Sequence, residues 1–542
     1  MKTNRKFWVC ATMACAVWAS TTMAATEQQK LDAINNGLAN LQSTQQAGGY
    51  WNYGGFEPAA TGASVLAFVS QKDKWGANAA NYQTAVDNAV NYLLSTATKV
   101  TVSTRNDGVN ICPSGSGSCD AVYWDAYANE DSYTTGLIIP ALVTYAAGKA
   151  NVVATTTGPL KDMTWGQIIQ ANTNLWAASQ STANQGNRIG GWRYILGQSI
   201  YDSDMSTTQW GIISLIYNQS FGATTPQIVK DDLKQWLAVA QDSGSGAGCY
   251  QPGVYCDHSD TGGLLLGLNF VGKTTSDDEV KKALIFLNTN WTQTANGIWF
   301  GNFGHPYAMW SVYKGLEVNI GLNDNTHITT LKTDCGASSS NLPGNPAGSK
   351  PCNWWEDYND WLVNNQNPDG SWTGYDYWYG PLATAFYVNI LGATQIPVDI
   401  PVPLDIHPTS CPNPINTNSN GIVPVAILGT KDLDVTKIDP TTIKLINPSL
   451  TNPLPVSPIR WTLENVATPY TGNLVDAFSC NTSGPDGYVD LTLKFDTKKL
   501  IAALGNVSNR AVLKLQVTGK LKAEFGGTPI KGEDIVLIIK NK

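Results

Sequence analysis

The stretch WLVNNQNPDGSWTGYDYWYGPLATAFYVNIL, residues Trp361–Leu391, decides the fold of this chain. Its pattern is typical of one helix, a loop rich in glycine and aromatic residues, and a second, apolar helix that Gly380-Pro381 opens. Five weaker copies precede it in the chain. Similar segments that recur every few tens of residues are the signature of repeat architectures. The sequence therefore predicts a fold built from repeated helix pairs.

The repeats run from Gln28 to about Ala393, and each ends in a helix that is apolar almost throughout. This apolar character indicates that the second helices are covered on all sides and form an inner layer. The first helices are amphipathic, which places them outside. Six such pairs that close on themselves give an (α/α)6 toroid, which we expect over residues 26–395. The six apolar segments are TGASVLAFV, TTGLIIPALVTYA, TTQWGIISLIY, TGGLLLGLNF, YAMWSVYKGL and ATAFYVNIL.

The composition changes after Gly392. Residues 396–413 contain many prolines and are typical of a linker. Residues 414–542 carry apolar and β-branched runs between turn residues, which predicts a β-sandwich. The expected fold class is thus multidomain α + β, a toroid followed by a sandwich. The expected strands are Val423–Leu428, Thr442–Ile446, Tyr488–Phe495, Ala511–Thr518 and Asp534–Ile539.

The N-terminus has the pattern of a secretory signal peptide, which we place at residues 1–24. Lys2, Arg5 and Lys6 precede an apolar run that is too short to span a bilayer, and Thr22-Met23-Ala24 offers a cleavage site of small residues. No later run is a better candidate, so we expect no transmembrane segment. The mature protein is therefore expected to be secreted or periplasmic.

Cysteine usage agrees with export. Cys10 and Cys15 lie in the predicted signal, so eight of the ten cysteines remain in the mature chain. An even number of cysteines in an exported protein favours disulfides over metal ligands. The expected pairs are Cys112–Cys119, Cys249–Cys256, Cys335–Cys352 and Cys411–Cys480.

The charge balance argues against two classes of ligand. Lys and Arg number 34 against 42 Asp and Glu, a net charge of −8, and only 14% of the residues are charged. A nucleic-acid surface requires clustered Lys and Arg, so we expect no nucleic-acid partner. Between the signal and Pro397 the only arginines are Arg105, Arg188 and Arg193, which argues against a diphosphate-binding site.

The repeats share one position just before each apolar helix. Proline follows it in three repeats, and proline favours the first position of a helix, so the shared position is an expected N-cap. Asp and Gly cap helices well and need no chemistry to explain them, whereas Glu and His are not preferred caps. The shared position holds Glu57, Asp131, Asp204, Asp257, His305 and Gly380.

In a closed toroid these six helix N-termini surround one mouth of the central cavity. Carboxylates and an imidazole would converge there, where helix dipoles favour anions. Such a ring can raise carboxyl pKa values and supply a general acid or base, or it can bind Ca²⁺. The alternative is that these residues only cap helices. The candidate catalytic residues are Glu57, Asp204 and His305, and the candidates for the cavity mouth are Asp131, Asp202, Asp257, Tyr375, Tyr377 and Trp378.

A family resemblance rests on two stretches. QNPDGSW at Gln366–Trp372 resembles the Q-x(2–5)-G-x-W repeat of squalene–hopene cyclases, and Gly190–Leu215 is similar to exported bacterial proteins with prenyltransferase and squalene-oxidase repeats. The resemblance covers about residues 28–393 and implies an α/α-toroid of the terpene cyclase and protein prenyltransferase type. Asp202-Ser203-Asp204-Met205 stands where the cyclases have Asp-x-Asp-Asp, which implies that Asp204 protonates a polyprene. Met205 replaces the last aspartate of that motif.

Two related classes share this general shape. Protein prenyltransferase β-subunits bind zinc through Asp, Cys and His, but the expected Cys249–Cys256 disulfide would remove Cys256 from such a site. Exported α/α-barrel glycosidases and polysaccharide lyases use carboxylates in an aromatic cleft. Glycoside hydrolysis needs two carboxyl groups at a set separation, which Asp204 with Glu57 or Asp257 would supply.

The C-terminal segment resembles a tail module of exported bacterial proteins in the phrase GPDGYVDLTLKFDT, a resemblance that implies no activity. Attachment to a cell surface is one role for such a module. Asp486 and Asp490 suggest a calcium loop, although the alternating ligands of an EF-hand are lacking. An ordinary Pro-Asp-Gly turn explains the same residues.

Two functions are compatible with these observations. In the first, the toroid binds an extracellular small molecule or polymer (a glycan, a hydrocarbon or a peptide) in or at its cavity. In the second, the toroid is an acid/base enzyme, either a polysaccharide lyase or glycosidase, or an acid-initiated terpenoid cyclase. Neither function requires a cofactor, and Ca²⁺ is the one metal that the carboxylates suggest.

Overall fold

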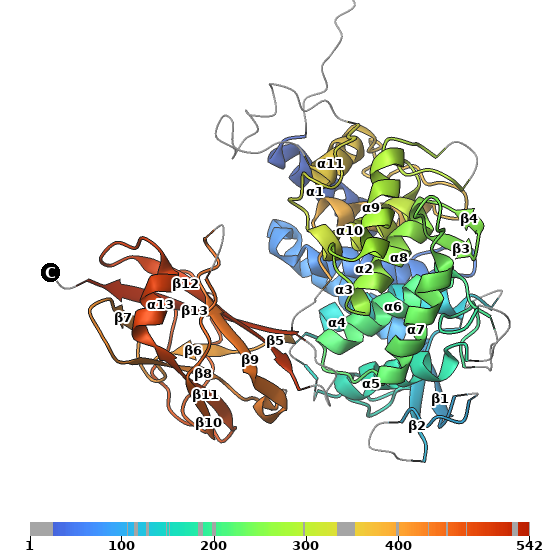
Figure 1. Cartoon of the computed structure of the whole chain (residues 1–542). Coiled ribbons are helices and arrows are strands. Elements are labelled where there is room, and N and C mark those ends of the chain that lie inside the picture. The colour runs from blue at the N-terminus through green and yellow to red at the C-terminus, as the bar shows by residue number, and fades with distance from the viewer. Residues whose placement is uncertain are drawn as a thin grey trace, which may run out of the picture.

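The computed structural model describes residues 25–540, apart from 106, 113–116, 126–128, 148, 151, 183–187, 198–201, 296–298, 333–352, 397–399, 432, 451–453, 473 and 523–528. The predicted signal peptide lies outside the described residues, as does the predicted Cys335–Cys352 pair. Figure 1 shows a helical part that runs from α1 to α12, followed by a part rich in strands.

Twelve α-helices of the helical part fall into six consecutive pairs in the described residues. The first helices of the pairs are α1 (Glu27–Thr44), α3 (Ala79–Ser95), α5 (Trp165–Ser179), α7 (Gln227–Ala240), α9 (Asp278–Asn290) and α11 (Trp354–Asn364). The second helices are α2 (Glu57–Ser70), α4 (Asp131–Tyr145), α6 (Met205–Ser220), α8 (His258–Phe270), α10 (Pro306–Ile320) and α12 (Gly380–Leu391).

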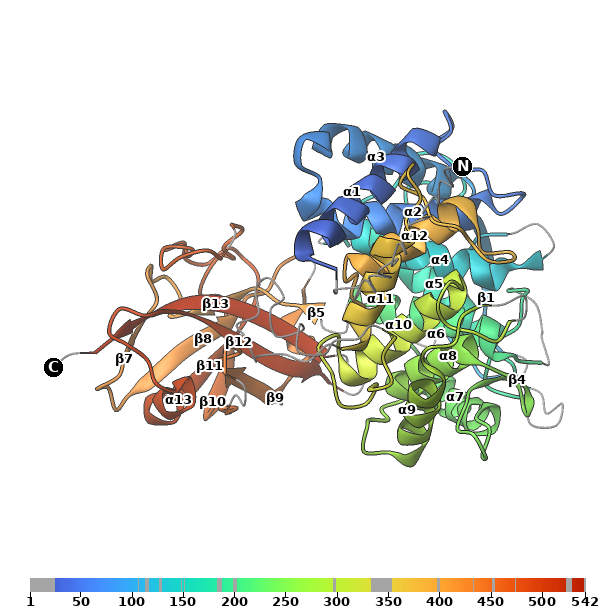
Figure 2. The same cartoon turned by 90° about the horizontal axis from the view of Figure 1, so that it is seen from above.

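The second helices form a closed ring of neighbours. Each packs against the second helix of the next pair, from α2 to α12, and α12 packs back against α2. Figure 2 shows α1 and α12 side by side where the two ends of this ring meet. Every residue of α6 is buried, whereas α7 buries only one apolar stripe. The second helices are therefore the inner layer that their apolar sequences predicted.

Close approach of two inner helices depends on a glycine. A Cβ atom at Gly262 of α8 would lie 2.3 Å from the carbonyl carbon of Ser311 on α10. Only glycine lets the two backbones pack at this separation.

The repeated loop sequence has a clear structural role. The indole of Trp372 donates a hydrogen bond to the carbonyl of Leu362, 2.8 Å away, at the end of the preceding outer helix. The Gln366 amide donates to the Gly370 carbonyl within its own loop and to the Ala33 carbonyl of α1, at 2.9 and 2.8 Å. The last repeat is thereby joined to the first.

The same two hydrogen bonds recur in earlier repeats, which is why the repeats are recognisable in sequence. Equivalent indoles are those of Trp51, Trp124 and Trp192, which donate to Leu41, Leu93 and Trp176. Equivalent glutamines are Gln45, Gln180 and Gln241, which donate to Ala85, Val229 and Glu279 of the next outer helix.

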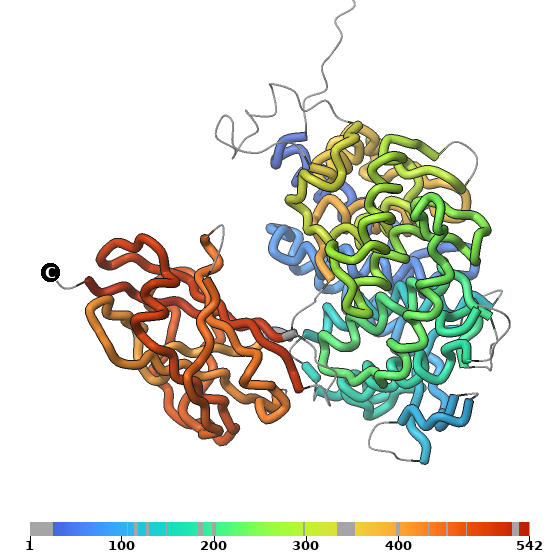
Figure 3. The backbone as a smooth tube through the Cα atoms, viewed as in Figure 1, coloured from blue at the N-terminus to red at the C-terminus, as the bar shows by residue number. Residues whose placement is uncertain are grey.

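Two β-sheets make up most of the C-terminal part. One has the strand order β10-β11-β8-β6, and the other has the order β5-β13-β12-β9, with β7 paired to β13. The tube in Figure 3 traces this part. The bounds are β5 (Ile400–Pro401), β6 (Leu404–Ile406), β7 (Pro414–Asn416), β8 (Ile422–Ile427), β9 (Ile438–Ile446), β10 (Arg460–Glu464), β11 (Asp490–Asp496), β12 (Val512–Leu521) and β13 (Pro529–Ile539), with a helix α13 (Thr497–Leu504).

Strands β5 and β6 lie within residues 396–413, the range predicted as a linker. β5 pairs with β13, and β6 pairs with β8, so this proline-rich segment contributes an outer strand to each sheet. Proline is tolerated there because edge positions leave one side of the strand without ladder hydrogen bonds. The sheet part therefore begins near Ile400.

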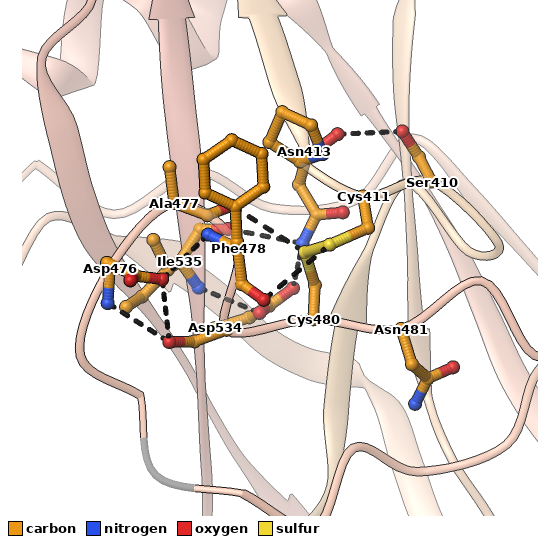
Figure 4. Close-up of a disulfide and its surroundings, with 12 residues drawn as sticks. Ser410, Cys411, Asn413, Asp476, Ala477, Phe478, Cys480, Asn481, Asp534 and Ile535 are labelled. Carbon is orange, nitrogen blue, oxygen red and sulfur yellow. Dashed lines mark hydrogen bonds between the residues drawn. A yellow bond between two sulfur atoms is a disulfide. The ribbon is translucent and has the colours of Figure 1, made fainter.

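Three of the predicted disulfides are confirmed. Cys112–Cys119 and Cys249–Cys256 each close a short loop, and Cys411–Cys480 joins segments 69 residues apart. Cys249–Cys256 ties the ends of the hairpin formed by β3 (Cys249–Gln251) and β4 (Val254–Cys256). Figure 4 shows Cys411–Cys480 beside Asn413 and Asp534. Within the described residues, the structure contains no helix that is both long and apolar enough to cross a membrane.

Candidate functional site

Two cavities lie at the N-terminal ends of the inner helices. The larger has a volume of about 770 Å³ and includes Tyr250, Asp257 and Asp260 in its wall. The smaller has a volume of about 460 Å³. Tyr133, Tyr194 and Trp299 line both cavities, so the two are adjacent. These volumes are typical of sites for small molecules or for one part of a longer ligand.

Equivalent residues of all six inner helices line these cavities. Each stands two residues after the position that the repeats share, on the first turn of its helix. Both cavities are therefore built around the mouth of the ring of inner helices. The six residues are Ala59, Tyr133, Ser206, Ser259, Tyr307 and Leu382.

The shared position begins each inner helix, but the expected N-cap is found in only three of the six repeats. It is the N-cap at Asp204, Asp257 and His305 and the first helical residue at Glu57, Asp131 and Gly380. Asp204 accepts the backbone N–H of Thr207 at 2.8 Å, and Asp257 accepts that of Asp260 at 2.9 Å. These bonds satisfy N–H groups that have no partner within the helix. Each carboxyl is thus turned back toward its own helix by capping.

Asp204 is further held by Arg193. It is completely buried, forms a short ion pair with Arg193, and accepts a 2.6 Å hydrogen bond from Ser206. Burial raises the pKa of Asp204, while Ser206 and Arg193 lower it. Arg193 also donates to the hydroxyl of Tyr250, which is 2.9 Å from that of Tyr194. Asp204 therefore anchors a network behind the tyrosines of the larger cavity.

The other acidic candidates are also bound to nearby groups. Glu57 begins α2 and accepts backbone N–H groups of the loop before it, at 3.1 Å from Gly55. Asp131 is buried and accepts the N–H of Leu196 at 3.1 Å. Asp202 pairs with Arg188 at 3.2 Å and with Arg193 at 3.4 Å.

His305 caps α10 in an unusual way for an imidazole. Its Nδ1 accepts the N–H of Ala308 at 3.4 Å, which assigns the proton to Nε2. Among the described residues, none accepts a hydrogen bond from this buried Nε2. Burial lowers the pKa of His305 to about 3, so the ring is neutral at physiological pH. A neutral imidazole can donate a hydrogen bond to a ligand but does not act there as a cationic acid.

Asp260 is a cavity carboxyl that the sequence reasoning missed. It lies on the first turn of α8 and lines the larger cavity, although only 3% of it is exposed. In the described part of the chain, no group donates a hydrogen bond to its Oδ1. Tyr133 and Tyr307 line the same cavity, and the charge of Asp260 helps to raise the pKa of both hydroxyls.

The start of α8 therefore carries two carboxyl groups in different environments, one at the N-cap Asp257 and one at Asp260 on the first turn. Burial raises the pKa of Asp257 to about 6, against hydrogen bonds from Asp260 and Ser259 that lower it. Burial raises the pKa of Asp260 well above its ordinary value, and the charges of Asp257 and Asp204 raise it further. When two such carboxyls interact, one retains its proton while the other ionises. Because burial and both neighbouring charges raise its pKa, Asp260 is the carboxyl whose protonated form is favoured.

Aromatic rings form the floor and wall of the site. Tyr307 stacks on Trp378 with ring centroids 4.5 Å apart and planes 7° from parallel. Trp378 and Tyr377 line the smaller cavity, whereas Tyr375 packs on His305 with centroids 4.7 Å apart. The Tyr53 hydroxyl donates to the Tyr377 carbonyl, so this segment also packs the join between the last and first repeats.

The suggested calcium residues have structural roles in the sheets. Asp490 is buried, and its two oxygens accept backbone N–H groups of Gly429, Val466 and Ala467. Asp486 accepts the N–H of Tyr488 at 3.0 Å in a turn. Across the described ranges, no cluster of three or more His, Cys, Asp or Glu side chains could hold a metal ion.

Two signals in the sequence point to the missed residues. Asp260 is the one carboxylate of the inner helix HSDTGGLLLGLNF, all but one of whose residues are buried, and there a charge is costly without a function or a partner. Tyr133 and Tyr307 occupy the same place in two repeats, two residues after the shared position. The alignment of the repeats was therefore in register, but the position two residues further on lines the cavities in all six repeats, whereas at the shared position it is Asp257 that lines a cavity.

Comparison with known proteins gives only distant likenesses. No protein-family model matches the sequence. No curated protein matches it either. A family 76 glycoside hydrolase (mannosidase) from Bacteroides thetaiotaomicron is similar in structure, with a TM-score of 0.40 and 12% identity over 67% of this chain and 98% of that chain.

Two further structures are similar to the same extent. A family 76 glycoside hydrolase from a bovine strain of Bacteroides thetaiotaomicron has a TM-score of 0.42 and 11% identity, over 68% of this chain and 78% of that chain. The type II terpene cyclase MstE from Scytonema has a TM-score of 0.39 and 15% identity, over 68% of this chain and 99% of that chain. Likeness at this level carries no argument about the site.

Proposed function

We propose that this is an exported (α/α)6 toroid with a β-sandwich module, and that it binds an extracellular ligand in the two cavities and transforms it by acid/base chemistry. Asp260 is the proton donor in this proposal. The observation that carries the proposal is a buried carboxyl with a raised pKa that belongs to the wall of an aromatic cavity and whose Oδ1 has no hydrogen-bond partner among the described residues. A carboxylic acid kept neutral in this way is poised to protonate a ligand.

The roles of the neighbouring residues follow from their contacts. Asp257 ionises before Asp260 and provides negative charge beside the ligand as cationic character develops in the reaction. Asp204, which the family resemblance implied as the acid, is instead a positioning residue in this proposal, because Arg193 and the helix cap hold it. The three disulfides support an extracellular or periplasmic setting.

Acid-initiated cyclisation of a polyprene is a second candidate. The observation in its favour is the stack of Tyr307 on Trp378, with Phe386 next to Trp378 at a centroid distance of 5.8 Å. Aromatic faces stabilise carbocations through cation–π attraction. Ligand binding without turnover is the remaining alternative, in which Asp260 only donates a hydrogen bond.

Asp260→Asn tests the proposal directly. The mature protein and the variant would be incubated with neutral and acidic polysaccharides and with squalene, and the products analysed by mass spectrometry. We expect the variant to fold and to lose turnover by a factor of about 10²–10⁴. Asp278→Asn is the control, because its exposed carboxyl lies on the outer helix α9 and belongs to the wall of neither cavity. Full activity of Asp260→Asn, or no turnover by the wild type, would contradict acid/base catalysis by this residue.

A further inference from the structure

Four large aromatic side chains stand exposed around the two cavities. The exposed fractions are 78% for Tyr255, 72% for Tyr377, 50% for Tyr379 and 42% for Trp299. All four line the cavity walls. Single exposed aromatics are ordinary on protein surfaces, but several around one opening mark an interaction site. Their position at the cavities indicates that they contact the ligand.

The backbone of Tyr255 has an unfavourable conformation. It is in β4, and its φ of 49° lies in the left-handed region that residues other than glycine rarely adopt. The hairpin keeps it there, because Cys249 pairs with Cys256 in register and is also joined to it by a disulfide. Strained residues of this kind are concentrated at functional sites.

The hairpin also places Tyr255 relative to the acid. Tyr255 stands two residues before Asp257 and five before Asp260, and all three line the larger cavity. The disulfide-closed hairpin leads directly into α8, which is itself part of the inner ring. The backbone of Tyr255 is therefore held at a set place beside the carboxyl pair.

The chemistry of the walls suits one class of ligand. The aromatic faces are apolar, whereas the same walls carry the hydroxyls of Tyr194 and Tyr250 and the carboxyls of Asp257 and Asp260. A pyranose ring has the complementary surface, since its C–H faces stack on aromatic rings and its edge carries hydroxyl groups. A hydrocarbon would offer no hydrogen bond to Oδ1 of Asp260, which has no partner among the described residues.

The two cavities together exceed the needs of a single ring. Trp299 lines both of them and is partly exposed, so one ligand can pass over it from one cavity to the other. Tyr377 and Tyr379 border the smaller cavity, and Tyr255 borders the larger one. Exposed aromatic side chains are thus present at both cavities and at the place where the cavities adjoin.

We propose that the ligand is an oligosaccharide chain that lies along both cavities, with Tyr255 as the stacking platform of one sugar subsite. This inference rests on the proposed function, because it names the substrate class for the same site. The platform binds the chain beside Asp257 and Asp260 and fixes which sugar unit reaches the acid.

The test uses the mature full chain in affinity electrophoresis against xylan, mannan, hydroxyethyl cellulose, alginate and pectin. We expect at least one of these polysaccharides to retard the wild type. For that polysaccharide, Tyr255→Ala should weaken binding by about tenfold or more, as truncation of a buried aromatic contact does. Tyr255→Phe keeps the stacking ring and should bind like the wild type. Tyr488→Ala, at an exposed tyrosine of the sheets, is the control and should have no effect.

Two further measurements make the outcome decisive. Titration with oligosaccharides of increasing length should show a gain in affinity at the length that reaches Tyr255, and Tyr255→Ala should abolish only that gain. Tyr255→Gly should lose binding while its melting temperature is not lowered, which excludes misfolding as the cause. If none of the five polysaccharides binds, or if Tyr255→Ala binds as the wild type does, the proposal is wrong.

Asp260→Asn separates this inference from the acid/base proposal. We expect the variant to bind the polysaccharide and not to transform it. If the wild type binds the polysaccharide through Tyr255 without turnover, acid/base catalysis fails and the glycan platform stands. If squalene is transformed in a manner that depends on Asp260 while no glycan binds, the platform fails and acid/base catalysis stands.

Discussion

Oδ1 of Asp257, the N-cap of α8, accepts the backbone N–H of Asp260 on the first turn at 2.9 Å, so the two carboxyl groups have different hydrogen-bonding environments. The same oxygen of Asp257 also accepts the hydroxyl of Ser259 at 2.7 Å, so its charged form is supported by two donors. Within the described residues, Oδ1 of Asp260 has no such support. One helix turn thereby produces an ionised group and a protonated group side by side.

This pair predicts the pH dependence of turnover. Asp260 must be protonated to act, so activity should be present at neutral pH and be lost as pH rises through a pKa well above that of an ordinary aspartate. The acidic limb should lie near pH 6, where Asp257 gains its proton. The rate measured from pH 4 to 10 should be bell-shaped, and Asp257→Asn should remove the acidic limb. An unchanged acidic limb in that variant would show that another group causes it.

Replacement of Asp204 should lower stability by more than a helix cap alone accounts for. Asp204→Ala removes the cap, at a cost of about 1 kcal/mol, and also leaves Arg193 without its buried partner. Asp204→Asn keeps an oxygen for the Thr207 N–H and should cost less. Urea denaturation of the two variants and the wild type gives the comparison. Equal stability of Asp204→Ala and the wild type would show that neither contact contributes.

The sheets should lose stability as pH rises from acid to neutral. Burial raises the pKa of Asp534 to about 7 and that of Asp405 to about 6, both above the values of an unfolded chain. A folded state that holds extra protons is stabilised below the unfolded pKa, and the benefit is lost as pH rises through the folded pKa. The free energy of unfolding should therefore fall between about pH 4 and pH 7.

Asp534→Asn identifies the group responsible for this pH dependence. Asn413 and the backbone N–H of Ile406 donate to Asp534 at 2.9 and 2.6 Å, and an asparagine oxygen can accept both bonds. The variant cannot titrate, so chemical denaturation at several pH values should show a smaller slope for the sheets. The same slope in the variant and the wild type would exclude Asp534 as its source.

The Cys411–Cys480 disulfide should stabilise the sheets more than the short hairpin disulfide stabilises the toroid. It closes a loop of 69 residues, whereas Cys249–Cys256 closes one of 7. Loss of a bridge over a long loop costs about 2–5 kcal/mol, and loop closure predicts a smaller cost for a short one. Calorimetry of the two paired Cys→Ser variants measures both costs. The reverse order would show that native-state contacts outweigh loop entropy.

Replacement of Tyr255 by glycine should release backbone strain and should not lower the free energy of unfolding. Its φ of 49° costs of order 1–2 kcal/mol for a residue with a side chain, and glycine adopts the same conformation freely. Tyr255→Gly should therefore be as stable as the wild type or more stable, whereas Tyr255→Ala keeps the strain. Guanidinium denaturation compares the two variants. A marked loss of stability in Tyr255→Gly would mean that the exposed ring contributes packing.

The repeats could be predicted because their signals are local. A helix that is apolar on every side must be inner, and Gln366 and Trp372 recur because each repeat needs the same hydrogen bonds to its own outer helix and to the next one. The register of the shared position was also readable, since capping residues and a following proline mark a helix start. Disulfides between near neighbours such as Cys249 and Cys256 followed from spacing in an exported chain.

The cavity chemistry was decided only by the tertiary structure. Capping turns Asp204 and Asp257 back to their own helices, a preference that the sequence shows, but the burial that raises the pKa of Asp260 comes from neighbouring helices. Tyr133 and Tyr307 approach Asp260 from α4 and α10, which are distant in the chain. Helix formation and capping depend on a few consecutive residues, whereas desolvation depends on everything packed around a group. The sequence by itself therefore determined the repeated helix pairs. Only the packing of these helices around Asp260 determined which carboxyl keeps its proton.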